Sequence, residues 1–296
     1  MTSFFDEIRR NQLKSILLML IFGALFTVII YLLILLLGGS VFAFAIAGII
    51  VIAYAAFSYQ YGSKIVLKAS GAKKADKDQY PVLYDIVEEM ALATQVKMPD
   101  VYIINDQNPN AFATGKNKNH ASVAVTTGLL QMMNKNELEG VISHEMSHIA
   151  DNDIQFMLLV VVFAGVIGIV AAFIRMFAFL GAIGGGERQG GGIILLIALV
   201  ISILAPLVAM LIRLAISRKR EYMADANGAR ITRAPMYLAS ALKKIQGYEN
   251  KPNAPAVKNT NEVTAMLYFA NPLSKKSIMN LFSTHPPIED RIAGIL

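Results

Sequence analysis

The chain of 296 residues contains no cysteine, which excludes disulfide bonds and thiolate metal ligands. Charged residues are also scarce, at 16% of the chain against roughly 25% in a typical soluble protein. Hydrophobic residues make up 55%, and the mean hydropathy is +0.51. This balance predicts a membrane protein with a modest soluble part.

The net charge is +6 and the isoelectric point is near 9.3, values that also occur in nucleic-acid-binding proteins. Basic loops beside membrane spans explain the charge better, because such loops are rich in lysine and arginine on the cytoplasmic side. We therefore expect a lipid bilayer, and no nucleic acid, among the partners.

Four apolar runs are long enough to span a bilayer, and they divide the chain into four parts. Residues 1–61 form an N-terminal hairpin (runs 15–37 and 41–61), and residues 154–212 form a second hairpin (runs 154–180 and 193–212). Residues 62–153 and 213–296 are then the two halves of one soluble domain. The alternative for the second hairpin is a buried hydrophobic helix pair in a soluble domain.

Basic residues flank these hairpins. They occur in the N-terminal tail, in the connector from Lys64 to Lys77, and between Arg213 and Arg220. The positive-inside rule then places both termini and the soluble domain in the cytoplasm. The expected location is the cytoplasmic (inner) membrane, crossed several times.

One stretch carries a chemical motif, His144-Glu145-Met146-Ser147-His148. On a helix, residues four apart lie one above the other, so both imidazoles can bind one tetrahedral Zn²⁺. Glu145 is then close enough to take a proton from a water molecule that the metal polarises. The alternative is a pair of structural histidines whose hydrogen bonds are satisfied in a core.

Flanking residues predict the local structure. Asn136 and Glu139 resemble a capping box that begins the motif helix, and Asn152 suits the left-handed backbone that often ends one. Further predicted elements are an amphipathic helix from Tyr80 to Val96 with Val82, Leu83, Ile86, Val87 and Met90 on one stripe, strands at 101–104, 111–114 and 122–126, a polar loop at 115–120, helices at 218–229 and 237–248, a mobile loop at 249–261, and a short C-terminal helix after Pro287.

A catalytic zinc needs a third protein ligand. His120 and His285 are the other histidines, so a carboxylate is favoured, and Glu221 is the best candidate. Asp225 follows it by four residues on the same helical face, where it can orient a ligand imidazole. The alternative is a solvated charged face, because Arg218-Lys219-Arg220 precedes Glu221.

These motifs, in this order, resemble the M48 zinc metallopeptidases: HEMSH, the later EYMAD, the upstream Asn110-Ala111-Phe112-Ala113 and the terminal STHPP. The four apolar runs are similar to the HtpX heat-shock protease branch. The CAAX-processing relative Ste24 has more membrane spans, and Oma1-like relatives are more distant. Asn152 is a departure, because relatives often have Gly before the aspartate matched by Asp153.

The resemblance implies a set of roles. His144, His148 and Glu221 bind one zinc ion, Glu145 is the catalytic base, and Asp225 supports a ligand from outside the metal's coordination sphere. Asn110 and His285 match positions that help bind substrate or its oxyanion. His120 has no motif support and is expected to be an exposed loop residue.

The expected fold is mainly α with an α+β part: a polytopic membrane protein with two apolar hairpins and a zincin-type cytoplasmic protease domain with a small β-sheet. The expected function is zinc-dependent cleavage of damaged or misfolded membrane proteins, with polypeptides as substrates. Three alternatives stay open: a non-catalytic scaffold with structural zinc, a transporter, and a CAAX-type processing protease. The scaffold would need a fourth protein ligand, and the transporter would need ionisable residues within its spans, where only Arg175 occurs.

Overall fold

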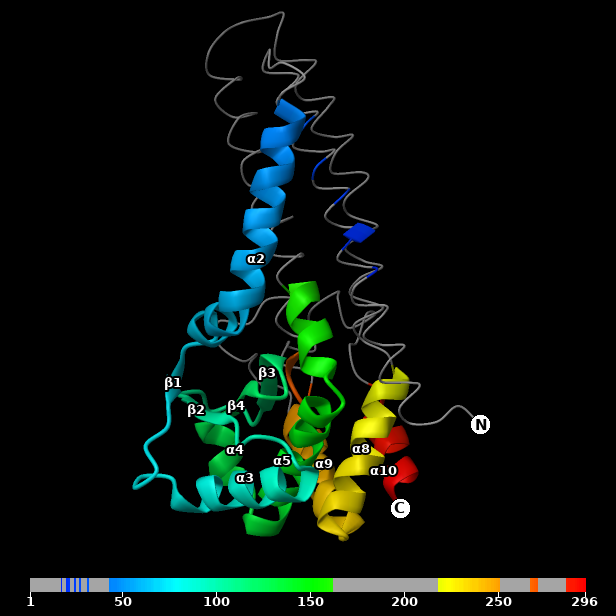
Figure 1. Ribbon diagram of the computed structural model, residues 1–296. Coiled ribbons are helices and arrows are strands. Elements are labelled where there is room, and N and C mark those ends of the chain that lie inside the picture. The colour runs from blue at the N-terminus through cyan, green and yellow to red at the C-terminus, as the bar shows by residue number, and fades with distance from the viewer. Residues whose placement is uncertain are drawn as a thin grey trace, which may run out of the picture.

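The computed structural model describes residues 43–161, 218–250, 267–270 and 286–296, with six single positions between Leu17 and Tyr31 (Figure 1). His285 lies outside these residues. Most of the first apolar run, of the second hairpin and of the loop at 249–261 also lies outside them. The predictions made for those segments therefore remain predictions.

Helix α2 (Ala43–Ala69) is the longest described element, and it rises away from the rest of the molecule (Figure 1). It covers most of the second apolar run and continues into the basic connector. Within the described part of the chain, no helix combines the length and apolar character needed to cross a membrane. The predicted spans are thus not confirmed here.

A sheet of four strands has the order β1-β2-β4-β3. The strands are β1 (Ala72–Lys74), β2 (Asp100–Ile104), β3 (Ala111–Asn117) and β4 (His120–Thr126). β2 and β4 are parallel, while the β1–β2 and β3–β4 pairs are antiparallel. The three predicted strands are confirmed, and β3 lies at an edge of the sheet.

The predicted polar loop at residues 115–120 is wrong, because both strands run on into it. The Asn117 side chain accepts a hydrogen bond from the Asn119 N–H at 3.0 Å, which closes a tight turn. The β3–β4 connection is therefore a short hairpin turn, and His120 begins a strand with its side chain exposed.

Helix α3 (Pro81–Thr94) matches the predicted amphipathic helix. Its buried face contains Leu83, Ile86, Val87 and Met90, but Val82 is 49% exposed and does not belong to it. Val82 precedes Leu83 by one residue, so it points about 100° away from the buried stripe. The short helix α4 (Thr127–Met132) follows β4 and begins at the cap residue Thr126.

Helix α5 (Lys135–Ala150) carries the motif, and almost all of its residues are buried. The capping box exists but lies two residues earlier than predicted, at Asn134 and Glu137. The Glu137 carboxylate explains this register, because it also accepts hydrogen bonds from Ser240 (2.7 Å) and Lys244 (2.6 Å). Asn152 has a φ of 59°, as its tolerance of left-handed backbone predicts.

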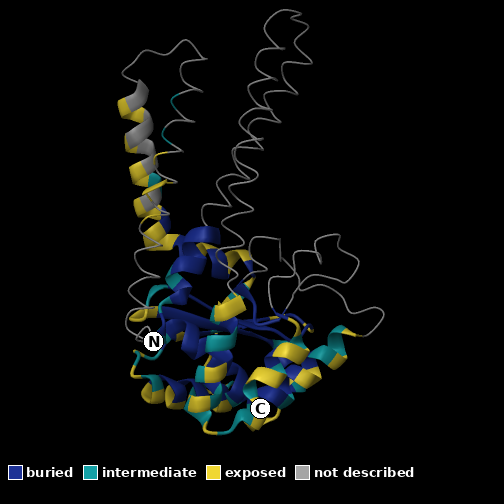
Figure 2. Ribbon diagram, turned by 90° about the vertical axis from the view of Figure 1, so that its right-hand side faces the viewer, coloured by how far each residue is buried: buried dark blue, intermediate teal, exposed yellow. Residues whose placement is uncertain are grey.

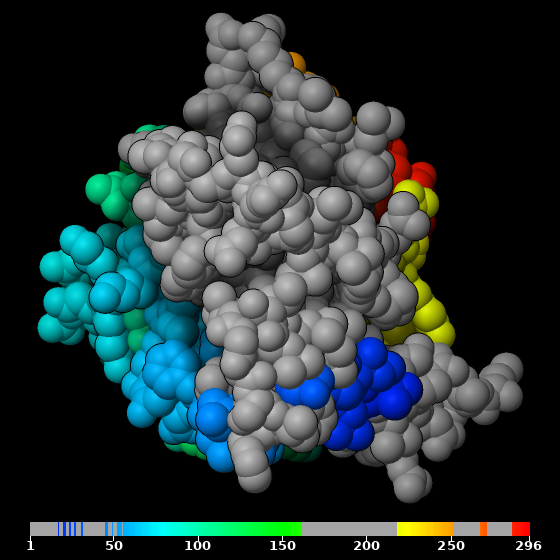
Figure 3. Space-filling view, turned by 90° about the horizontal axis from the view of Figure 1, so that it is seen from above, coloured from blue at the N-terminus to red at the C-terminus, as the bar shows by residue number. Residues whose placement is uncertain are grey.

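Three further helices pack in the same domain: α8 (Arg218–Thr232), α9 (Pro235–Glu249) and α10 (Ile288–Ile295). Helix α5 packs against α3, α8, α9 and β3, so it lies at the centre of the domain (Figure 1). Burial is concentrated around it, while α2 carries exposed positions along its length (Figure 2). Seen from above, α2 and the α8–α10 pair lie on different sides of the molecule (Figure 3).

Glycines allow the close helix contacts around α5. A Cβ on Gly140 would lie 2.5 Å from the backbone nitrogen of Leu238 in α9. A Cβ on Gly228 of α8 would lie 3.1 Å from the backbone nitrogen of His144. The absence of a side chain at these two positions brings α8 and α9 onto the motif helix.

Candidate metal centre

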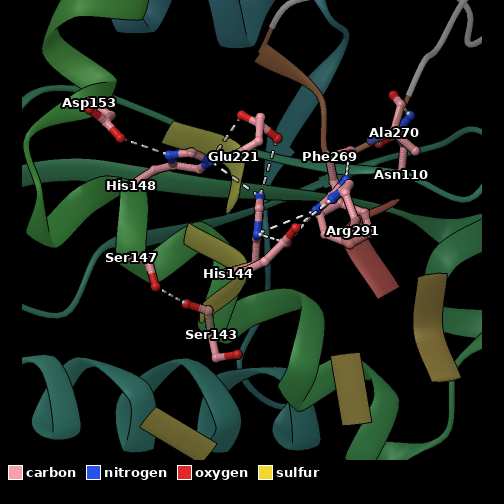
Figure 4. Close-up of polar contacts among 11 residues, drawn as sticks. Asn110, Ser143, His144, Ser147, His148, Asp153, Glu221, Phe269, Ala270 and Arg291 are labelled. Carbon is pink, nitrogen blue, oxygen red and sulfur yellow. Dashed lines mark hydrogen bonds and ion pairs between the residues drawn. The ribbon is translucent and has the colours of Figure 1, made fainter. Parts of the chain in front are cut away.

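The helical spacing of α5 places His144 and His148 side by side with their Nε2 atoms 3.2 Å apart. Glu221 reaches them from α8, with its carboxylate oxygens 3.9 Å from His144 Nε2 and 3.6 Å from His148 Nε2. All three side chains are buried, and their candidate ligand atoms lie within 4.8 Å of one another (Figure 4). Among the described residues, no fourth carboxylate or imidazole joins this group.

Two further carboxylates lie beside the Nδ1 atoms of the two imidazoles. Asp225 lies 2.9 Å from His144 Nδ1, and Asp153 lies 3.2 Å from His148 Nδ1 (Figure 4). An ionised carboxylate only accepts hydrogen bonds, so each Nδ1 carries the proton that it donates. In the neutral form of each ring the free lone pair is then on Nε2, the atom that lies 3.9 Å (His144) or 3.6 Å (His148) from a Glu221 carboxylate oxygen.

This convergence of donors fits a zinc ion. Two neutral imidazoles and one carboxylate are a common protein ligand set of catalytic zinc, and the carboxylate partners behind the histidines fix their tautomers. Without a metal ion or an additional proton, lone pairs and negative charge would face each other in a buried space. The donor set therefore suits a single divalent ion.

Burial and charge shift the pKa of each histidine. Burial lowers the pKa of His144 to about 4, against the opposing effect of Asp225. Burial also acts to lower the pKa of His148, but its hydrogen bond to Asp153 and the charges of Glu221 and Asp153 outweigh it and raise the pKa to about 9. A proton on His148 is thus the species that a metal ion would displace.

Glu145 follows His144 on helix α5, and its carboxylate lies against strand β3, within electrostatic reach of His148 and Glu221. Burial raises its pKa to about 7, and the Ala113 N–H donates a hydrogen bond to it, which opposes that rise. A carboxylate with a pKa near neutrality is suited to take up and release a proton at physiological pH. The Glu145 side chain is 2% exposed, so it has almost no contact with solvent.

Arg291 was missed by the reasoning from sequence. It is 1% exposed, and its guanidinium donates to both oxygens of Asp225, from Nε at 2.9 Å and from Nη2 at 2.7 Å. The same side chain donates to the Phe269 carbonyl oxygen at 3.0 Å (Figure 4). Burial would raise the pKa of Asp225, but the charge and hydrogen bonds of Arg291 hold it below its usual value.

A pattern in the sequence could have revealed Arg291. Ile288, Ile292 and Ile295 recur at helical spacing, and all three pack against the core. Arg291 occurs on the same stripe, where a charge needs a buried partner. No comparable pattern points to Phe269, whose ring lies edge-on to His144 with centroids 5.0 Å apart.

Asn110 is buried beside β3, and its amide is engaged with the backbone. Its Oδ1 accepts hydrogen bonds from the N–H groups of Ala111 and Ala270, and its Nδ2 donates to the Ala270 carbonyl. The segment 267–270 thereby lies along the start of β3, where Tyr268 pairs with Phe112. Asn110 thus holds this segment at the sheet edge. The other residue predicted to contact substrate, His285, lies outside the described residues.

Comparisons with known proteins agree with this arrangement. The sequence pattern of Peptidase family M48 matches residues 77–296. A "Protease HtpX homolog" from Caldanaerobacter subterraneus subsp. tengcongensis is 48% identical over 85% of this chain and 85% of its own length. Another protein of that name, from Dictyoglomus turgidum, is 38% identical over 98% of this chain and 93% of its own length.

One solved structure also resembles the chain. The crystal structure of S. mikatae Ste24p matches with a TM-score of 0.51 and 16% identity, over 98% of this chain and 66% of that chain. At this level of identity, the likeness concerns the fold alone.

Proposed function

Because the chain belongs to peptidase family M48 and is a zinc metalloprotease, we propose that it is an endopeptidase of the cytoplasmic membrane that cleaves damaged or misfolded membrane proteins. One observation carries the catalytic part: two histidine lone pairs and the Glu221 carboxylate converge in a buried space. Its zinc ligands are His144, His148 and Glu221. Asp225 and Asp153 orient the two imidazoles.

Glu145 is the catalytic base of this proposal. A bound zinc ion supplies a Lewis acid that activates water and polarises a carbonyl group. Glu145 takes the proton of the attacking water and later donates it to the departing amine. Its pKa near 7 suits both steps, and the Ala113 N–H steadies its ionised form.

The substrate binds as an extra strand along β3. The Ala111 carbonyl accepts from the Phe269 N–H, so Ala111 directs its backbone groups to the free edge of the sheet. Residues two apart point the same way, which turns Ala113 and Gly115 to that edge as well. An extended peptide there runs beside Glu145 and is bound through its backbone more than its side chains.

Asn110 and His285 assist the substrate in this proposal. The hydrogen bonds of Asn110 support the idea indirectly, because they place segment 267–270 on the part of the edge that precedes Ala113. The substrate strand therefore begins where this segment ends. His285 is proposed to stabilise the oxyanion, on the strength of the STHPP motif.

The membrane part rests on the four apolar runs and on the basic residues that flank them. His148 precedes the second hairpin and Glu221 follows it, yet the two side chains meet at 3.6 Å. That hairpin must therefore leave and return on one side of the bilayer. In the proposed topology the metal centre then lies beside the cytoplasmic surface, where substrates emerge from the bilayer.

The direct test is to measure metal content and peptide cleavage on the same sample. The full chain, purified in a neutral detergent, should contain one zinc ion per chain and cleave casein or an unfolded membrane protein. A chelator should remove both zinc and cleavage, and added zinc should restore them. Zinc bound without any cleavage would support the non-catalytic scaffold instead.

A further inference from the structure

A second cavity lies away from the metal centre and shares none of its residues. Its volume is about 280 Å³, and it is formed by the end of α2, the segment before β2 and the β3–β4 hairpin. The lining includes three lysines, Lys64, Lys97 and Lys116, together with His120 and the hydroxyls of Ser63 and Ser122.

The charge in this cavity favours an anion. Asp100 is the single carboxylate among its lining residues, and it is paired with Lys74 at 3.1 Å. Lys64 and Lys97 are exposed, while Lys116 donates to Gln60 at 2.9 Å. Ammonium groups combined with hydroxyl donors are suited to a phosphate group, whose oxygens accept several hydrogen bonds.

The type of exposed side chain changes along helix α2 toward the cavity. Three isoleucines near its far end are exposed, at 55% (Ile46), 67% (Ile49) and 71% (Ile52). Exposed aromatic residues follow toward the cavity, at 52% (Phe57) and 44% (Tyr61). Lys64 comes next, at the cavity itself, followed by Ile65 at 49%, so the helix passes from mainly aliphatic through aromatic exposed residues to a basic one at the cavity.

That order matches the layers of a phospholipid monolayer. From Ile52 to Lys64 the helix rises by roughly 18 Å, at about 1.5 Å per residue. Aromatic side chains favour the boundary between acyl chains and headgroups, and lysines favour the phosphate level. A soluble phosphate would use the cavity alone, whereas a phospholipid would also contact the exposed apolar residues of α2.

We propose that this cavity binds the phosphate of an anionic phospholipid, whose acyl chains lie along the exposed face of α2. The inference rests on the membrane location within the proposed function, and not on the proteolytic chemistry. The bound lipid would hold the sheet, and with it the edge strand β3, at a fixed depth beside the bilayer surface.

Lipid binding can be measured on the full chain carrying Glu145→Ala, which removes the proposed proteolytic activity. The protein in neutral detergent is titrated with phosphatidylglycerol or with phosphatidylcholine, and bound lipid is counted by native mass spectrometry. We expect one phosphatidylglycerol to be retained in preference to phosphatidylcholine. Inorganic phosphate and glycerol phosphate should compete only weakly.

A charge-matched pair of triple variants tests the site. Lys64→Gln, Lys97→Gln and Lys116→Gln together should weaken phosphatidylglycerol binding on the order of 100-fold. The control combines substitutions at three exposed lysines that do not line the cavity (Lys73→Gln, Lys77→Gln and Lys135→Gln), and it should bind as before. Both triple variants should keep one zinc ion per chain, which shows that they are folded.

Three results would overturn the lipid site: equal loss in both triple variants, equal binding of the two lipids, or full competition by glycerol phosphate. The last result would assign the cavity to a soluble phosphate. The same variants with Glu145 intact are also assayed for casein cleavage in detergent. If the cavity variant lost its lipid preference but kept casein cleavage, the effect would be confined to the lipid site. If the wild-type chain did not cleave casein, the proposed protease function would be contradicted.

Discussion

Arg291 connects the C-terminal helix α10 to the metal centre through a single carboxylate. Its two donor groups hold both oxygens of Asp225, and Asp225 in turn holds His144 Nδ1 at 2.9 Å. Arg291 Nη2 also lies 3.5 Å from that nitrogen. We therefore regard Arg291 as a positioning residue, which acts on the metal through Asp225.

The test is a double-mutant cycle with Asp225→Ala and Arg291→Ala. Each single variant should weaken zinc affinity by about 10- to 100-fold, as changes behind a metal ligand usually do. The double variant should be little worse than either single one, because both remove the same support. Zinc affinity is measured by competition with a chromogenic chelator.

Arg291→Lys is the conservative companion to this cycle. Lysine keeps the charge but lacks the planar fork that holds both oxygens of Asp225. Compared with Arg291→Ala, the Arg291→Lys variant should recover most of the folding stability but little of the zinc affinity. If the losses of zinc affinity in the two alanine variants were additive in the double variant, Arg291 would not act on His144 through Asp225.

The reasoning from sequence brought together the residues that are adjacent on helices. The spacing of His144 and His148 and of Glu221 and Asp225 places each pair on one helical face, and the structure shows both pairs at one site. Arg291 could not be placed in this way, because its partner lies 66 residues away on another helix. Long-range pairs of this kind depend on tertiary packing rather than local periodicity.

At the level of elements, close contact between helices shapes the site. Gly140 allows α9 to approach α5, since a Cβ there would lie 2.7 Å from the carbonyl carbon of Tyr237 and 2.5 Å from the nitrogen of Leu238. Those atoms belong to the backbone and cannot move without shifting the helix. The same contact supports the part of α5 that precedes His144.

Gly140→Ala should therefore lower the free energy of unfolding by about 1–3 kcal/mol, the usual effect of overpacking. Gly247→Ala is the matched control, because a Cβ at this helical position meets no atom within 4 Å. It should raise the free energy of unfolding by up to about 1 kcal/mol through helix propensity. Denaturant unfolding of both variants in detergent provides the measurement, and similar changes in the two would contradict the packing argument.

Glu137 gives the domain a pH dependence. Burial acts to raise its pKa, but Lys244, the Asn134 N–H and Ser240 outweigh burial and hold it below the usual value of 4.5. A carboxyl with a lowered pKa stabilises the folded state fully above the unfolded-state pKa, and the contribution is lost as pH falls through the folded-state pKa. The relevant window therefore lies below pH 4.5.

Glu137→Gln should reduce the free energy of unfolding at pH 7 by about 1–2 kcal/mol, since it weakens the cap and the contact with Lys244. Its stability should then fall less steeply than that of the wild type as the pH is lowered through this window. Thermal unfolding in a series of buffers measures both curves. Parallel curves would mean that Glu137 contributes no pH dependence.

Most described elements agree with the periodicity of the sequence, and the errors have physical causes. The capping box lies at Asn134 and Glu137 because Glu137 also binds Lys244 and Ser240, contacts that no local pattern predicts. The pairing of Tyr268 with Phe112 likewise joins segments far apart in the chain. The strand order β1-β2-β4-β3 was also beyond local reasoning, because β2 pairs with β4 and not with β3, the strand that follows it in sequence.

For the whole molecule, the proposed topology places the protease domain on one side of the membrane. The chain has no natural cysteine, so single cysteines can report on accessibility without interference. Asp78, Asn136 and Lys243 are exposed positions on three separate parts of the domain. Each is substituted by cysteine in turn.

An impermeant thiol reagent added to intact cells should leave all three cysteines unlabelled. Permeabilised cells should show full labelling at all three positions, which is the control for exposure. Labelling at any of the three in intact cells would place the domain outside the cytoplasm and contradict the topology.

In the proposed mechanism, Glu145 moves protons at a zinc ion that other residues hold. The most direct measurement compares Glu145→Ala with the wild type for zinc content and for casein cleavage. The control is Glu139→Ala on the same helix, whose charged neighbours are Glu89 and Lys135. We expect Glu145→Ala to keep one zinc ion and to lose cleavage by at least about 100-fold, with the control unchanged. Cleavage at the wild-type rate, or loss of the zinc ion, would contradict the role of Glu145.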